Sequence, residues 1–369
     1  MNPFSLFGLG LSLFCLAFNL YTAWWLVRRL ALKPWGRFLV IEAALLLSAL
    51  YPVSRPFAAA HSGAFADGVL WLGFFVLGAS FIIFWSLAVC DLLLAAARAR
   101  GRAAALACLA LAGGLVILAA WQGRKAPEVV RLEIALKNLP PALDGFTVMQ
   151  VSDLHLGRMI GLERLEGIAA EAAVLKPDLI AFTGDFSERR ERMPPGVCEV
   201  LKGMTARLGK VSVLGNHDMF TGGEPAAAFF EGCGFKMLRG QVYEPAPGLA
   251  VGGVDDLRRG NGESVKKLAL SLDRSKPLIF LSHQPEGFDY ITASGSGLVL
   301  CGHTHNGQIF PFNLLEFRMF KYFYGLYREK DFFVYVTSGA GTWGPPLRLF
   351  TRSELPVFTL RVDSPGGKR

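Results

Sequence analysis

The chain has 369 residues, of which 52% are hydrophobic, and its mean hydropathy is +0.37. This balance is too apolar for an ordinary soluble enzyme, so part of the chain must lie in lipid. The net charge of +8 is concentrated before residue 122, where eight basic and three acidic residues give +5. The remainder carries only +3, so the pI near 9.2 gives no reason to expect nucleic acid as a partner.

Four apolar stretches in the first third of the chain predict membrane-spanning helices. They cover residues 4–27, 38–53, 68–97 and 103–121. About twenty apolar residues cross a bilayer core, so three stretches are long enough, whereas the second is short and contains Glu42. No basic residue precedes the first stretch and no small-residue cleavage site follows it. We therefore expect an integral membrane protein rather than a secreted one.

The charges between these stretches predict the orientation. Seven Lys or Arg residues lie in the first and third connections, but only Arg55 lies in the second. Because basic connections stay in the cytoplasm, four spans would place the rest of the chain on the extracytoplasmic side of a bacterial inner or cell membrane. If the second stretch is re-entrant, the count becomes three and the domain lies inside. Cys198, Cys233 and Cys301 cannot all pair with one another, so no disulfide framework is predicted.

Beyond the spans, the pattern changes to short alternating units. We predict a transmembrane region at 1–123, a linker and first strand at 124–145, and a folded domain at 146–369. The expected strands are 146–152, 177–185, 211–218, 278–283, 298–303, 332–338 and 356–362, and the expected helices are 162–176 and 196–208. Alternating strands and helices predict an α/β layered domain, with two sheets packed together.

Polar residues gather where these apolar strands end. They are Asp153, His155, Asp185, Asn216, His217, Asp218, His283, His303 and His305. Open α/β sheets place ligand sites at the carboxyl ends of strands. One such Asp is usually a turn or cap residue, and one such His is usually structural, but five blocks in series predict a metal site. His303 and His305 would aim at one object if their backbone stays extended.

The residue types predict which metals and which chemistry. Carboxylates, imidazoles and an amide oxygen without thiolates suit Mn²⁺ first, and also Fe or Zn²⁺. Seven candidate ligands are too many for one ion and fit two divalent ions with one shared carboxylate. Two ions about 3.5–4 Å apart clamp a phosphoryl group and provide a hydroxide at neutral pH. The sequence therefore predicts a metal-dependent hydrolase of phosphoesters.

The motifs "SDLHLG", "TGD", "GNHD", "LSH" and "GHTHNGQ" resemble the calcineurin-like metallophosphoesterase superfamily over residues 146–310. The tail "YVTSGAGTWGPPLRLFTRSELPVFTL" is similar to its membrane-associated branch. The resemblance implies a four-layer α-β-β-α fold and a dinuclear centre. By motif position, one ion would be held by Asp153, His155 and His305, the other by Asn216, His283 and His303, with Asp185 bridging. His217 would protonate the leaving oxygen or stabilise the transition state, with Asp218 orienting it. Asn306 departs from the glycine often found there.

The stretch after "GHTHNGQ" bears on the substrate. Residues 309–333 interleave Phe and Tyr with Arg318, Lys321, Arg328 and Lys330. One interpretation is a long connection with aromatics packed beneath it. The other is an apolar, basic lip that rests on the bilayer and admits a phosphorylated lipid.

Three functions stay open from the sequence. The first is a phosphodiesterase or phosphatase acting on a lipid or cell-envelope substrate at the membrane. The second is a cytoplasmic hydrolase of a UDP-2,3-diacylglucosamine-type pyrophosphate, as in lipid A synthesis. The third is a non-catalytic phosphate-binding sensor or transporter; His217 with Asp218 argues against it, because a binder needs no leaving-group acid. Only Glu42 and Asp91 are acidic within the spans, which is thin support for transport. The sequence gives no indication of oligomeric state.

Overall fold

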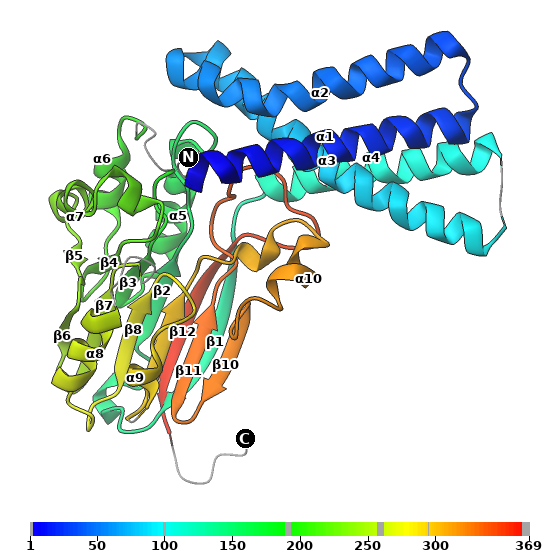
Figure 1. Ribbon diagram of the computed structural model, residues 1–369. Coiled ribbons are helices and arrows are strands. Elements are labelled where there is room, and N and C mark those ends of the chain that lie inside the picture. Colours follow the sequence, from blue (N-terminus) through cyan, green and yellow to red (C-terminus); the bar gives the residue numbers. More distant parts are fainter. Residues whose placement is uncertain (1–2, 99–100, 189–192, 257–261, 294, 364–369) are drawn as a thin grey trace. The chain divides into compact units, whose positions relative to one another are not determined.

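The computed structural model describes residues 3–98, 101–188, 193–256, 262–293 and 295–363 (Figure 1). Arg100, one of the basic residues used for orientation, lies outside this part. The chain forms two compact units. The first comprises Met1–Arg124, Ile309–Pro311 and Gly344–Phe350, and the second comprises the rest.

The first unit contains four long apolar helices. They are α1 (Pro3–Leu30), α2 (Pro34–Ala60), α3 (Ala64–Ala96) and α4 (Arg102–Arg124), and each is long and apolar enough to cross a membrane. The expectation that the second span is short is wrong, because α2 runs for 27 residues through Pro52 and Pro56. At 1.5 Å per residue it is about 40 Å long, which exceeds a bilayer core of about 30 Å.

Polar side chains between the helices are paired with one another. The amide of Asn19 donates to Ser48 Oγ at 3.1 Å and accepts from Ser80 Oγ at 2.9 Å. Asp91 accepts from Arg29 at 2.5 Å and from Trp25 Nε1 at 2.9 Å. Buried polar groups in lipid need such partners. These contacts join α1 to α2 and to α3.

Two loop segments complete the first unit. Ile309, Leu347 and Leu349 pack in one cluster with Ile82 of α3 and Ala119 of α4. The segments also pair with each other and with α4, since Phe310 N donates to Leu349 O at 3.2 Å and Arg348 N donates to Ala119 O at 3.0 Å. The chain therefore enters the helical unit again twice after residue 308.

The second unit is built on two six-stranded sheets. The first has the order β1-β12-β2-β3-β4-β5, and the second has β10-β11-β9-β8-β7-β6. The strands of the first are β1 (Glu128–Leu136), β2 (Thr147–Val151), β3 (Leu179–Thr183), β4 (Lys210–Val213), β5 (Lys236–Met237) and β12 (Glu354–Val362). Those of the second are β6 (Gln241–Ala246), β7 (Leu249–Val254), β8 (Leu278–Ser282), β9 (Gly297–Cys301), β10 (Gly325–Glu329) and β11 (Phe332–Val336).

The strands that carry the predicted site residues are parallel within each sheet. β2, β3, β4 and β5 pair in parallel in one sheet, and β7, β8, β9 and β11 do so in the other. β12 is antiparallel to β2 and parallel to β1, while β6 and β10 are antiparallel edge strands. Parallel pairing brings the carboxyl ends of β2, β3 and β4 to one edge, and those of β8 and β9 to another.

Three buried clusters define four layers. One cluster contains side chains of β2 and β3 with those of α5 (Leu162–Leu175), α6 (Val197–Gly203) and α7 (Gly223–Gly232). A second lies between the two sheets, and a third joins β8 and β9 to α8 (Gly262–Ser271) and α9 (Asp289–Thr292). Val148 belongs to the second cluster and Met149 to the first. Both faces of each sheet are thus covered, which explains the continuous apolar strands (Figure 1). The expected α-β-β-α fold is confirmed.

A disulfide lies in the first helical layer. It joins Cys198 of α6 to Cys233, which follows α7, whereas Cys301 is free and buried at the end of β9. Three cysteines in one domain left this pairing undetermined from the sequence. The structure places two of them together and keeps the third apart.

Candidate metal centre

The predicted site residues lie on the loops and short 3₁₀ helices that follow the parallel strands. Asp153 follows β2, Asp185 follows β3, and Asn216 lies beyond β4 in the first sheet. His283 directly follows β8, and His303 lies two residues after β9, in the second sheet. The site therefore forms where strand ends of the two packed sheets meet. This is the place that the sequence pattern predicted.

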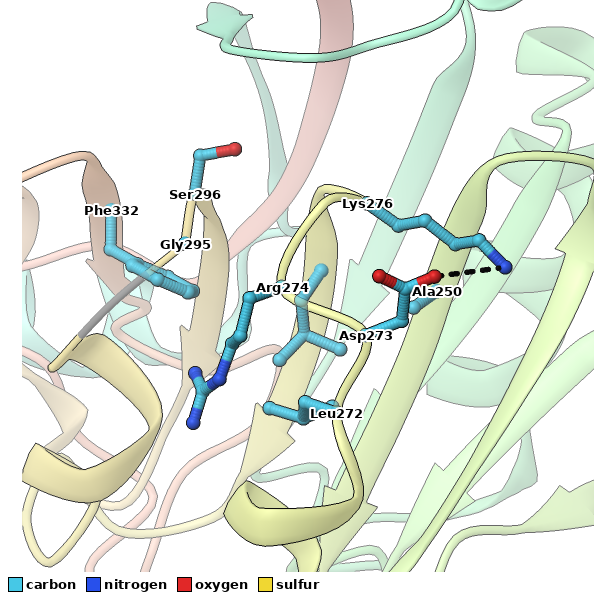
Figure 2. A pocket seen from close by; sticks show the side chains of 9 residues that line it. Ala250, Leu272, Asp273, Arg274, Lys276, Gly295, Ser296 and Phe332 are labelled. Carbon is cyan, nitrogen blue, oxygen red and sulfur yellow. Dashed lines mark ion pairs between the residues drawn. The ribbon is translucent and has the colours of Figure 1, made fainter.

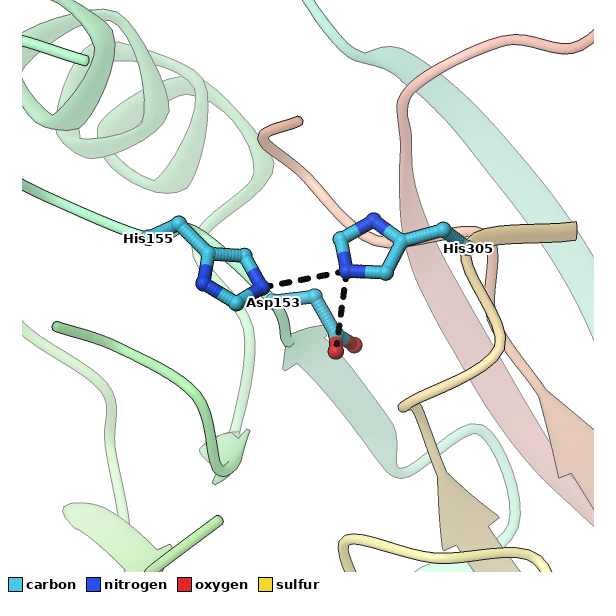
Figure 3. Close-up of side chains that lie close together, drawn as sticks. All are labelled: Asp153, His155 and His305. Atoms are coloured by element: carbon cyan, nitrogen blue, oxygen red, sulfur yellow. Dashed lines mark hydrogen bonds and ion pairs between the residues drawn. The ribbon is translucent and has the colours of Figure 1, made fainter. Parts of the chain in front are cut away.

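Asp153, His155 and His305 form the first cluster of donor atoms. His155 Nε2 lies 3.0 Å from His305 Nε2, and His305 Nε2 lies 3.6 Å from Asp153 Oδ1. Figure 3 shows the two imidazole rings next to each other, with the Asp153 carboxylate beside the ring nitrogens that approach each other. All three side chains are buried. Their donor atoms lie within 4.8 Å of one another, as a metal site requires.

The second cluster lies around His283. Its Nε2 atom is 3.2 Å from His303 Nδ1 and 3.2 Å from Asn216 Oδ1. Asp185, His283 and His303 also offer donor atoms within 4.8 Å of one another. The mixed oxygen and nitrogen set fits Mn²⁺, Fe or Zn²⁺. The residues assigned to the second ion by motif position are thus brought together.

Asp185 lies between the clusters. Its Oδ2 atom is 3.2 Å from His283 Nε2 and 3.8 Å from His155 Nε2. The other oxygen, Oδ1, accepts a hydrogen bond from His217 N at 2.7 Å. One carboxylate oxygen therefore faces donor atoms of both clusters while the other is fixed by the backbone. This geometry supports the predicted bridging position of Asp185.

The ligand loops hold an unusual backbone conformation. Asp153, His155, Asp185, His303 and His305 have φ between 50° and 77°. Asp and His adopt this left-handed region more readily than most residues, and such conformations gather at functional sites. The sequence predicts that both histidines of "GHTH" point at one object if their backbone is extended. The backbone at His303 and His305 is left-handed instead, so this expectation is wrong. His305 contacts the first cluster and His303 the second, as motif position implied.

Asn306 and two glycines fit the same loops. Asn306 has φ 54° and ψ 35°, a left-handed conformation that asparagine tolerates well, so its departure from glycine preserves the turn. Gly184 has φ +90°, and a Cβ there would lie 2.5 Å from Gly215 N. A Cβ on Gly215 would lie 2.2 Å from Asp185 Oδ1. The loops after β3 and β4 can approach each other only because both positions are glycine.

Two imidazoles are fixed by contacts at Nδ1. His283 Nδ1 lies 2.9 Å from the carbonyl of Thr183 and must donate to it, because a carbonyl only accepts. His155 Nδ1 lies 2.9 Å from Glu188 Oε2. These contacts leave both Nε2 atoms to face the clusters. Histidine ligands in metalloproteins are oriented in this way.

Glu188 was missed in the sequence analysis. Its second oxygen, Oε1, lies 3.2 Å from His217 Nδ1, so one carboxylate faces both His155 and His217. Burial would raise the pKa of Glu188, but the two histidines lower it well below its ordinary value. Glu188 is therefore ionised at every pH of interest. The available signal was its position three residues after Asp185 in the same strand-end loop, "GDFSE".

Asp218 has a different role from the one predicted. Its carboxylate accepts from Ser187 N at 3.0 Å and from Gly215 N at 3.0 Å. Asp218 thus joins the loops after β3 and β4. The carboxylate placed to orient the His217 imidazole is that of Glu188, because the backbone at His217 is helical, with φ −71° and ψ −40°, rather than extended.

His217 is buried and bordered by three rings. It lies 4.7 Å from the His155 ring, 5.9 Å from Phe220 and 6.2 Å from Trp343. His217 also forms a group of possible donors with His155 and Asp185. His217 therefore lies beside the first cluster of donor atoms and beside Asp185.

A small pocket lies at the end of the second sheet away from the metal-ligand loops. It is lined by residues before β8 and β9, including Arg274 and Lys276, whereas the site residues follow those strands (Figure 2). Arg274 donates to the carbonyls of Ile291 and Ala269 at 2.9 and 2.8 Å. Lys276 pairs with Asp273 at 3.4 Å. These cations stabilise chain turns, so the pocket is structural.

A proton and a metal ion compete for the His283 donor atom. Burial lowers the pKa of His283, but the Asp185 and Asp153 carboxylates raise it more, to about 10. His283 is therefore protonated at pH 7 and must lose that proton to bind a metal. We expect divalent metal binding to release at least one proton at pH 7, and the affinity to rise as the pH approaches 10.

Calorimetric titration of Mn²⁺ in two buffers with different ionisation enthalpies measures this release. The observed binding enthalpy should depend on the buffer. An enthalpy that is identical in both buffers would contradict the assignment of His283 as a protonated donor.

The comparisons with known proteins follow this geometry. Residues 146–307 match the family model of calcineurin-like phosphoesterases. A Danio rerio transmembrane protein with a metallophosphoesterase domain is 34% identical over 64% of this chain and 57% of its own length. Metallophosphoesterases of Aquifex aeolicus and Bacillus subtilis are 30% and 33% identical over 63% of this chain, and over 92% and 85% of their own lengths.

The extent of these matches differs between the relatives. The chain spans less than two thirds of the length of the Danio rerio protein and of a similar Bos taurus protein, at 57% and 60%. It spans most of the two bacterial proteins. Because the chain is at least 30% identical to these two bacterial metallophosphoesterases over most of their length and matches the family model, it belongs to the calcineurin-like metallophosphoesterase family.

Proposed function

We propose that the chain is a membrane-anchored, two-metal phosphoesterase that hydrolyses a lipid or cell-envelope phosphoester. The observation that carries this proposal is the position of Asp185 Oδ2, which faces His155 of one cluster and His283 of the other. Asp153, His155 and His305 would hold one ion, and Asn216, His283 and His303 the second. Such a pair, Mn²⁺ before Fe or Zn²⁺, would activate water and neutralise the charge of the phosphoryl group.

The chain's own residues would complete the hydrolysis. Water forms a bond to phosphorus while the ester P–O bond breaks, and the leaving oxygen needs a proton. His217 would donate that proton, since its imidazole lies beside donor atoms of the first cluster and its Nδ1 lies 3.2 Å from Glu188 Oε1. Glu188 positions His217 and His155 together. Asp153, His155, Asp185, His283 and His305 are buried, whereas Asn216 and His303 are half-buried, so the site stays accessible on the side of the second cluster.

The membrane region supports a substrate at the bilayer. Four helices are long and apolar enough to span it, and the polar contacts of Asn19 and Asp91 are those of helix packing. A sensor or transporter finds less support, because in the described part of α1 to α4 these polar groups pair with one another. A tethered enzyme meets lipid-linked phosphates far more often than dilute soluble ones.

The test of this reaction is hydrolysis by the full-length protein in detergent. It should cleave bis(p-nitrophenyl) phosphate with Mn²⁺ and lose activity when EDTA removes the metal. Lipid phosphodiesters and lipid pyrophosphates, assayed in parallel, would identify the preferred class. Full activity in EDTA, or no cleavage of any ester with Mn²⁺, Fe²⁺ or Zn²⁺, would overturn the proposal.

We further propose that the catalytic domain is extracytoplasmic. The support is the excess of basic residues in the first and third connections, together with the Cys198–Cys233 disulfide, since disulfides persist in oxidising compartments. An alkaline phosphatase reporter fused to the C-terminus should be active, and a fluorescent protein that matures only in the cytoplasm should be dark.

The opposite reporter pattern would contradict this topology. It would favour the cytoplasmic hydrolase of a UDP-lipid pyrophosphate instead. The same reporters fused between α2 and α3 provide the control, since α2 and α3 are separated by one short connection that four spans would place on the side of the domain.

A further inference from the structure

The segment that follows the metal loop exposes large apolar side chains. It comprises α10 (Phe312–Glu316) and the turn after it. Leu314 is 59% exposed, Leu315 56%, Phe317 64% and Met319 65%. We call these four residues the α10 surface. Figure 1 shows α10 beyond the strand ends rather than on a face of the sheet. Clustered exposure of this kind marks a site of interaction with an apolar partner.

This segment is fixed to the metal loop. A Cβ at Gly307 would lie 2.3 Å from Asn313 Cα, so the loop and α10 are in direct contact. Thr304 Oγ1 donates to the carbonyl of Phe323 at 2.8 Å, and the Phe320 ring lies 5.8 Å from the His303 ring. The α10 surface is therefore held next to the donor cluster.

Chain continuity indicates a lipid rather than a soluble partner. α10 begins directly after Ile309–Pro311, a segment that belongs to the unit of membrane helices. Within that unit Ile309 packs with Ile82 of α3 and Ala119 of α4. A peptide bond thus joins an exposed apolar helix to the part of the molecule that needs a bilayer.

The charges near α10 favour an anionic head group. Arg318 is exposed between Phe317 and Met319, whereas Glu316, the acidic residue of α10, is half-buried and burial raises its pKa to about 7. An exposed basic residue next to exposed apolar ones suits a lipid interface. The predicted lip was too wide, however. Lys330 Nζ donates to Ala293 O, and Arg328 stacks over Phe333, at the far end of β10 and β11. Of the residues predicted to form a lip, we therefore consider only those of α10 and the turn after it.

We propose that the α10 surface binds the acyl chain of the lipid whose phosphoester reaches the metal centre. This inference rests on the proposed function and deepens it, since it makes the substrate class an acylated amphiphile. The acyl chain of the lipid would lie along Leu314, Leu315 and Phe317, and Arg318 would face the lipid head group.

The test compares two substrates that share one reacting group. p-Nitrophenyl methyl phosphate and p-nitrophenyl hexadecyl phosphate differ only in the chain. Full-length protein in detergent micelles should cleave the hexadecyl ester with the higher kcat/KM. The variant Leu314→Gln/Phe317→Gln should lose about tenfold on the hexadecyl ester, through KM, and keep its rate on the methyl ester.

Leu270→Gln is the matched control, because Leu270 on α8 is also apolar and 81% exposed. It should leave both rates unchanged. A second measurement does not depend on catalysis. Hexadecylphosphonate, which carries the same hexadecyl chain but no ester bond, should raise the Tm of the wild type more than that of the α10 variant. Met319→Gln, in the turn outside α10, repeats the test if the double variant does not fold.

The outcomes separate the two claims. Equal losses on both esters, or no loss on either, overturn the acyl-chain role of α10 while the phosphoesterase stands. Failure of the wild type to cleave even the methyl ester with metal overturns the proposed function itself, and the acyl-chain role with it.

Discussion

Asp185→Asn is expected to abolish most of the activity and to reduce the metal content from two ions per chain to one or fewer. The carboxylate faces His155 of the first cluster and His283 of the second through the same oxygen, Oδ2. An amide offers one neutral oxygen in place of two charged ones. Loss of a group that only orients a ligand costs about 10–100-fold, so loss of a shared ligand should exceed 100-fold in kcat.

The fold should survive this substitution. Burial raises the pKa of Asp185, but His283, His217 and His155 lower it well below its ordinary value, so the wild-type group is ionised and its charge is balanced by imidazoles. Asp273→Asn, at an exposed turn, is the control for losing one carboxylate. Wild-type activity together with full metal content in Asp185→Asn would refute the bridging role.

His217→Ala is expected to keep both metals and the fold but to lose about 10²–10⁴-fold in activity. The loss should be larger on alkyl esters than on p-nitrophenyl esters, because a poor leaving group needs the proton more. Metal analysis and rates on both ester classes measure this. Loss of a metal equivalent would make His217 a ligand, and equal losses on both classes would remove its role as an acid.

Glu188→Gln provides the companion variant, since Glu188 contacts both His217 and His155. The neutral amide keeps the shape but removes the carboxylate that contacts Nδ1 of both His217 and His155. The loss should again be larger on alkyl esters, and metal affinity should fall about 10–100-fold through His155. A variant with unchanged ester selectivity and unchanged metal affinity would leave Glu188 with a packing role only.

The strands and the position of the site could be predicted because local patterns determine them. β2, β3, β8 and β9 are short apolar runs that end in polar residues, and parallel pairing brings such ends together. The exact ends of helices and strands were harder to predict from the sequence. The helix predicted over 196–208 ends at Gly203, where a glycine weakens it. The strand predicted over 211–218 ends at Val213, since the next residues form the ligand loop.

The contacts within the site could be predicted only in part. Motif position grouped Asp153 with His155 and His305, and the structure brings these residues together. The carboxylate that contacts the His217 imidazole comes from a different loop of the site. Glu188 of the β3 loop does so, and adjacency in the sequence suggested Asp218 instead. Periodicity carries no information about such contacts between loops, nor about left-handed backbone at the ligands.

The most direct test of the central claim is a metal titration of the metal-free, full-length protein, with bound metal and hydrolysis measured on the same samples. Two clusters joined by Asp185 predict two equivalents of Mn²⁺ per chain, with activity rising as the second site fills. Asp185→Asn, run alongside, should not reach two. Saturation of both binding and activity at one equivalent, or full activity without metal, would contradict the account.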